Sequence, residues 1–154
     1  MTKGAIYSNF PSKGALLLAA VAAKGLILSK RGRSTTLREE LGKTARELVN
    51  LVRRAKGEEL FIAQFQLYAL GDAELMKEIA ATYTSGFAST SSYLASLKGM
   101  ESSGMRPDEL AVALQAIALG FTVQSFFSPD AITKSVVEET FQALAAGLCD
   151  RRAH

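Results

Sequence analysis

Apolar residues recur at spacings of three and four along most of the chain. No stretch alternates apolar and polar residues with a period of two, and no Asn-Gly pair marks a hairpin. A spacing of three and four places apolar side chains on one face of an α-helix. The pattern therefore predicts an all-α fold. The clearest apolar stripe consists of Leu37, Leu41, Ala45, Leu48 and Val52.

Prolines, glycines and short polar residues predict where the helices begin and end. Ser12, the segment Ser34 to Thr36, and Asp72 are suited to cap helix N-termini. Pro107 fits the first turn of a helix, and Ser128-Pro129-Asp130 is expected to start the last one. Residues 99–104 are expected to form a loop. The predicted helices cover residues 11–29, 34–54, 57–71, 72–98, 107–127 and 128–148.

Length and apolar content indicate one soluble domain. At 154 residues with 48% hydrophobic residues, the chain is long enough to bury a core. The nearest candidate for a membrane span, residues 15–28, is too short and is interrupted by Lys24. The N-terminus lacks the basic start, apolar stretch and cleavage site of a secretion signal. We therefore expect a cytoplasmic protein without membrane contact.

Residues that carry catalytic or metal chemistry are scarce. Cys149 is the single cysteine and His154 the single histidine, so we expect no disulfide, no metal site and no cofactor. The acidic pairs Glu39-Glu40, Glu58-Glu59 and Glu138-Glu139 are adjacent in sequence, and adjacent residues do not face each other on a helix. The sequence therefore does not predict an enzyme.

Charge is distributed unevenly along the chain. Residues 1–56 hold 12 Lys and Arg against three Glu, whereas residues 57–154 hold six Lys and Arg against 12 Asp and Glu. A basic first third on an acidic body fits a nucleic-acid-facing end joined to a regulatory end. The alternative is that Lys30, Arg31 and Arg33 only solvate a connection between helices.

The most specific motif lies in the first 18 residues. Residues 2–18 read Thr-Lys-Gly-Ala-Ile-Tyr-Ser-Asn-Phe-Pro-Ser-Lys-Gly-Ala-Leu-Leu-Leu. This order resembles the TetR-like family of bacterial transcriptional regulators. In that family a recognition helix of the form Ser/Thr-x-Gly-x-(apolar)-Tyr-x-x-Phe precedes a turn, Ser-Lys and an apolar helix. The alternative is an N-terminal capping turn with Tyr7 and Phe10 in the core.

The resemblance implies that this segment contacts operator DNA. Gly4 would let the backbone approach a base edge, Lys3 would reach a base or a phosphate, and the Tyr7 hydroxyl would meet a phosphate. Lys13 would add a phosphate contact at a helix start. The DNA-facing candidates are Thr2, Lys3, Gly4, Tyr7, Ser8, Asn9 and Lys13.

The resemblance also divides the chain into two regions. Residues 1–30 correspond to a partial helix-turn-helix, and residues 31–154 to a helical ligand-binding and dimerisation domain. About two further helices precede the motif in the family, and Met1 stands directly at the motif. We therefore expect a shortened regulator that needs those helices to bind double-stranded operator DNA. The alternative is a ligand-binding or dimer-forming helical module without DNA binding of its own.

In the family, a small molecule bound in the helical body releases the operator, and the regulator is usually a repressor. We expect a small apolar or amphipathic ligand. Its candidate contacts are aromatic and amide side chains of the central helices, namely Phe61, Gln64, Phe65, Tyr68, Tyr83, Phe87, Tyr93, Gln115 and Phe121. Aromatic residues at helical spacing also fit a plain core. The Ser- and Thr-rich run over 82–92 either lines a polar cavity or faces water.

The last two predicted helices carry many large apolar residues. Such surfaces indicate either a core helix pair or a subunit interface. In the family these two helices pair with their copies in a four-helix bundle, so we expect a homodimer through them. Small residues there would permit close approach of helices, namely Ala113, Ala116, Gly120, Ala143, Ala145, Ala146 and Gly147.

Overall fold

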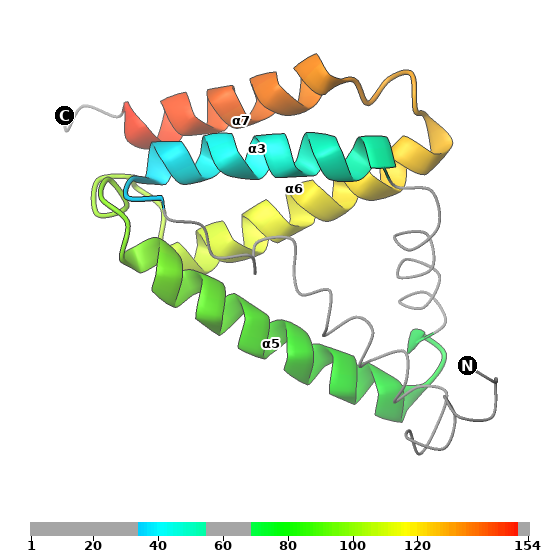
Figure 1. Ribbon diagram of the computed structural model, residues 1–154. Coiled ribbons are helices and arrows are strands. Elements are labelled where there is room, and N and C mark those ends of the chain that lie inside the picture. The colour runs from blue at the N-terminus through cyan, green and yellow to red at the C-terminus, as the bar shows by residue number, and fades with distance from the viewer. Residues whose placement is uncertain (1–33, 55–68, 151–154) are drawn as a thin grey trace, which may run out of the picture.

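The computed structural model describes residues 34–54 and 69–150, which form four α-helices (Figure 1). No strand occurs in these two ranges, which contain one isolated parallel bridge between Thr36 and Lys98. The prediction of an all-α fold is confirmed. The helix predicted over 11–29 and most of the one predicted over 57–71 lie outside the described residues. The four helices are α3 (Leu37–Arg54), α5 (Ala73–Ala95), α6 (Pro107–Phe127) and α7 (Lys134–Cys149).

Helix α3 begins at a reciprocal cap. Thr36 Oγ1 accepts a hydrogen bond from Glu39 N at 3.2 Å, and Glu39 Oε2 accepts from Thr35 N at 2.9 Å and Thr36 N at 3.2 Å. This exchange satisfies N–H groups that a helix start leaves without a partner. The hydrogen bonds, first that from the Thr35 backbone, lower the pKa of Glu39. The predicted cap within Ser34 to Thr36 is confirmed, with Thr36 as the capping residue.

Helices α5 and α6 also begin where the sequence predicted. Asp72 Oδ1 accepts hydrogen bonds from Glu74 N and Leu75 N, both at 3.1 Å. Pro107 occupies the first turn of α6, and the carboxylate of Glu109 accepts from Arg106 N at 3.1 Å. Local capping chemistry therefore sets both starts.

The predicted end of α5 near Lys98 is wrong, because the helix stops at Ala95. Lys98 N donates to Thr35 O at 3.1 Å, and Leu37 N donates to Lys98 O at 2.9 Å. These bonds tie Lys98 to the segment before α3 and take its backbone out of the helical pattern. A contact between distant parts of the chain therefore ends the helix.

The predicted start of α7 at Ser128-Pro129-Asp130 is also wrong. The N–H groups of Ala131 and Ile132 both return to Ser128 O, at 3.1 and 3.2 Å, and form a turn. Thr133 then accepts a hydrogen bond from Val136 N at 3.3 Å, and α7 begins at Lys134. Thr133 provides the side-chain cap that fixes the start.

The helices pack as two main pairs, with α3 at the centre. Helix α3 lies along α7, whereas α5 and α6 contact each other where α5 ends and α6 begins and diverge from there (Figure 1). A smaller contact joins α3 to α6. The interpretation of the last two helices as a core pair is therefore not supported, since α7 packs mainly on α3 and α6 mainly on α5.

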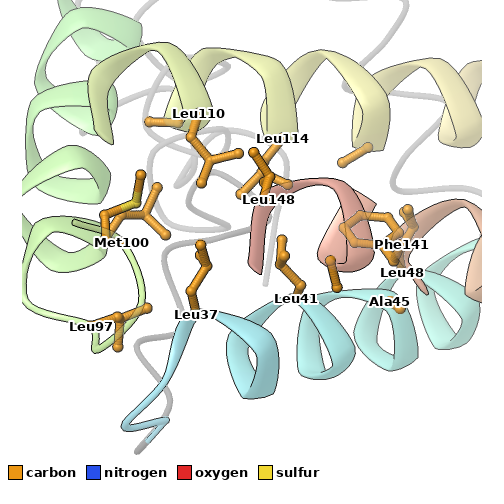
Figure 2. Close-up of a cluster of buried hydrophobic side chains, with 14 of the residues drawn as sticks. Leu37, Leu41, Ala45, Leu48, Leu97, Met100, Leu110, Leu114, Phe141 and Leu148 are labelled. Atoms are coloured by element: carbon orange, nitrogen blue, oxygen red, sulfur yellow. The ribbon is translucent and has the colours of Figure 1, made fainter. Parts of the chain in front are cut away.

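The main core lies where α3, α6, α7 and the end of α5 meet (Figure 2). Four residues of the predicted α3 stripe are buried, and Val52 packs against them from the edge. The largest fully buried side chain among the described residues is that of Phe141 on α7. A second, smaller cluster consists of Ala69, Leu75 and Ile79. The predicted stripe of α3 is confirmed as a core face.

Helix α6 is the one described helix that is long and apolar enough to cross a membrane, and 33% of its most apolar window is buried. Gln115, Thr122 and Gln124 interrupt the apolar sequence of this helix, so an uninterrupted apolar run does not mark it. The core helix of a soluble protein has the same length and composition. Several large apolar side chains of α6 are exposed in the described part of the chain.

Replacing Leu41 by Ala should lower the free energy of unfolding by about 2–5 kcal/mol, because it leaves a cavity in the main core. Leu41 is 0% exposed, whereas Leu70 is 68% exposed. Urea unfolding of Leu41→Ala beside the control Leu70→Ala measures the difference. Equal losses in the two variants would show that α3 does not form the core described here.

Candidate functional site

Many of the predicted site residues lie outside the described residues. All seven DNA-facing candidates do so, and their role stays a prediction. The same holds for four of the ligand candidates, namely Phe61, Gln64, Phe65 and Tyr68. The other five ligand candidates lie on α5 and α6.

Two of the aromatic candidates on α5 contact each other. The ring centroids of Tyr83 and Phe87 are 5.8 Å apart, and the ring planes are inclined by 54°. Both side chains are half-buried, and Tyr83 packs against the cluster of Ala69, Leu75 and Ile79. This geometry is typical of a stabilising aromatic pair and leaves part of each ring accessible.

Tyr93, the third candidate on α5, is joined to α3. Its hydroxyl donates a 2.8 Å hydrogen bond to Glu40 Oε2, and Glu40 is only 4% exposed. Burial, and next the hydrogen bond to Glu40, raise the pKa of Tyr93 above its ordinary value. The phenol therefore stays neutral and serves as the donor that a buried carboxylate needs. The role of Glu40 could not be predicted from the sequence, because its partner Tyr93 lies 53 residues away in the chain.

Gln115 and Phe121 are the two candidates on α6. Phe121 is half-buried and packs against the main core. Gln115 is 8% exposed, and its Oε1 has no hydrogen-bond partner. It is the one buried side-chain oxygen or nitrogen in the described ranges with that status. Burying such an atom without a hydrogen-bond partner costs about 1–3 kcal/mol of folding free energy, so its presence calls for an explanation.

Three hydroxyls of the Ser- and Thr-rich run of α5 bind the backbone of their own helix. The hydroxyls of Thr82, Thr84 and Ser92 donate to the carbonyl oxygens four residues earlier, at 3.0, 2.8 and 2.9 Å. Thr84 and Ser92 are exposed, whereas Thr90 is buried. Back-bonding of this kind explains how the helix tolerates the run. The hydroxyls of Thr82, Thr84 and Ser92 are therefore used by the helix backbone. Among these three residues and Thr90, only Thr90 is buried.

A shallow groove of about 730 Å³ lies between α5 and α6. Of its lining, Phe87 is a predicted ligand contact, and Ser91 and Ser92 belong to the run expected either to line a polar cavity or to face water. The part of the lining on α6 was not predicted as a ligand site, because the groove forms where two helices meet. Its acidic end is partly neutralised, since Arg106 pairs with both Asp108 and Glu109. The groove is lined by Phe87, Ala88, Ser91, Ser92, Asp108, Glu109, Val112 and Ala113.

An exposed apolar stripe runs along α6. Val112, Leu119 and Phe127 lie seven and eight residues apart, a spacing that keeps them on one face of a helix. All three are exposed, Phe127 to 79%, and Val136 on α7 is exposed as well. Exposed large apolar side chains in one row are typical of a surface that another chain covers.

Within residues 34–54 and 69–150, no group of three or more His, Cys, Asp or Glu side chains is placed to hold a metal ion. A comparison of the whole chain with models of protein families, with curated proteins and with solved structures finds no match. The site is therefore interpreted from its own residues.

Replacing Tyr93 by Phe should lower the free energy of unfolding by about 1–3 kcal/mol, because it leaves the Glu40 carboxylate buried without its donor. Chemical unfolding at neutral pH measures this loss. In a Glu40→Ala background the same substitution should cost much less, because no carboxylate remains to be satisfied. An equal cost in both backgrounds would contradict a specific bond between the two side chains.

Proposed function

We propose that the chain is a TetR-like transcriptional regulator in which a small molecule bound among the central helices weakens the binding of operator DNA. The motif over residues 2–18 is the observation that carries this proposal. Its residue order resembles the family pattern of a recognition helix followed by Ser-Lys, and it stands in the basic first third of the chain. The described helices would then form the ligand-binding and dimerisation part.

Two features of the helical body favour a ligand-binding role. Gln115 on α6 presents a buried amide oxygen without a partner, and Tyr83 and Phe87 form an aromatic pair on α5, which contacts α6. Apolar walls with a few placed polar groups are typical of small-molecule sites. The absence of a catalytic set in the sequence fits a binding role better than an enzymatic one.

The uncovered stripe of α6 favours a dimer. The described part of the chain leaves Val112, Leu119 and Phe127 exposed, and a second copy would remove these side chains from water. Twofold dimers bury the same patch of both subunits, so one apolar stripe supplies both halves of the contact. A twofold dimer would also place two recognition helices about one DNA turn apart.

Regulation would follow from coupling between the two sites. A ligand that binds one dimer state better than the other shifts the equilibrium by its difference in affinity. The bond from Tyr93 to Glu40 and the bridge from Lys98 to Thr36 join the end of α5 to the start of α3. A displacement of α5 would therefore be carried to α3, which follows the basic segment in the chain.

The test of DNA binding uses the chain extended by the helices that are expected before the motif. Bound sequences are selected from a pool of random duplexes, and the fluorescence anisotropy of the enriched sequence is then measured at several salt concentrations. The affinity should fall steeply with salt, because phosphate contacts release counterions. Lys3→Ala and Lys13→Ala should each weaken binding and reduce the salt slope by about one.

Lys98→Ala is the matched control, because Lys98 is an exposed lysine outside the motif and the substitution keeps its backbone bonds. It should leave both affinity and slope unchanged. If the extended chain enriches no sequence even at low salt, the DNA-binding part of the proposal fails. A ligand-binding or dimer-forming module then takes its place.

A further inference from the structure

The side chain of Gln115 has an unused hydrogen-bonding capacity inside the helical body. More than nine-tenths of the residue is buried, and its Oε1 has no partner. An amide oxygen that is buried without a hydrogen-bond donor is rare in folded proteins, because it loses its hydrogen bonds to water and gains none in exchange. A leucine or methionine at this position would avoid the loss of folding free energy that the unpaired oxygen causes.

The residues next to Gln115 on α6 do not satisfy it. Ala111 and Ala118, four residues before and three residues after it, are buried and have no polar side-chain atom. The Thr122 hydroxyl is buried on the same helix, but it donates to Ala118 O at 2.8 Å and is therefore occupied. The residues next to it on its own helix therefore offer the Gln115 oxygen no hydrogen-bond donor.

Charged groups are also scarce inside the described part of the body. Glu40 is its one buried ionisable side chain, and that carboxylate already accepts the Tyr93 hydroxyl. A charged ligand would therefore lose its hydration there without gaining a counter-charge from these helices. A neutral molecule with one hydrogen-bond donor can pair with Gln115 Oε1 without losing the hydration of a charge.

We propose that Gln115 Oε1 accepts a hydrogen bond from a hydroxyl or N–H group of a neutral, largely apolar ligand. This inference rests on the ligand-binding role proposed above and specifies the chemical class of the ligand. A site built around an unsatisfied acceptor discriminates strongly, because an analogue without the donor leaves the acceptor buried and unpaired.

The first measurement tests the premise on the free protein. Gln115→Met removes the unpaired oxygen and keeps the volume, so the thermal midpoint should rise by about 2–8 °C. Gln124→Met is the matched control, because Gln124 is an exposed glutamine on the same helix. It should not produce that rise. An unchanged or lower midpoint for Gln115→Met would show that the oxygen is satisfied, and would overturn the inference.

The second measurement tests the ligand class by calorimetric titration with matched pairs, namely 1-naphthol with 1-methoxynaphthalene and 1-decanol with its methyl ether. Within a pair, only the hydroxyl compound can donate. The natural chain should prefer the hydroxyl member by about tenfold or more, and Gln115→Met should lose that preference while still binding the ether.

The outcomes separate the two proposals. If both members of a pair bind equally to the natural chain, or the preference survives in Gln115→Met, the role of Gln115 is wrong while ligand binding stands. If no compound binds the natural chain, the proposed ligand-binding function itself fails for neutral apolar molecules, and the inference fails with it.

Discussion

The burial of the apolar stripe of α3 is the interaction on which the described structure depends. This face contacts α7 along its length and α6 across it, and the segment before it forms the bridge to Lys98. The same helix presents Glu40 to Tyr93 at the end of α5. Hydrophobic burial is not directional, so the caps and the Glu40–Tyr93 bond are needed to fix how the helices are placed around α3. A change in α3 therefore affects every other described helix.

The sequence predicted the elements that local chemistry controls. Asp72, Pro107 and the cap before α3 marked three helix starts correctly, because each acts on residues within one turn. The end of α5 and the start of α7 were wrong, because the bridge to Lys98 and the choice of Thr133 over Ser128 depend on the rest of the fold. The all-α class was predictable, whereas the packing of α7 on α3 was not.

The candidate site was less predictable than the fold, because aromatic residues at helical spacing fit both a core and a ligand site. Tyr93 serves a buried carboxylate, and Phe121 packs against the main core. Gln115 differs, since its amide oxygen is buried without a partner. Helix α6 is apolar on nearly all sides, so periodicity did not indicate which of its faces would be left exposed. Fold alone does not identify function, and the proposed role rests on the motif, on Gln115 and on the stripe of α6.

The mass of the protein in solution tests most directly whether the stripe of α6 is a subunit contact. Sedimentation equilibrium should give twice the 16.5 kDa mass of one chain at micromolar concentration. Leu119→Arg should shift the mass to that of one chain, because it places a charge in the stripe, whereas Leu70→Arg should keep the dimer. A mass of one chain for the natural protein at all concentrations would contradict the account of a twofold regulator.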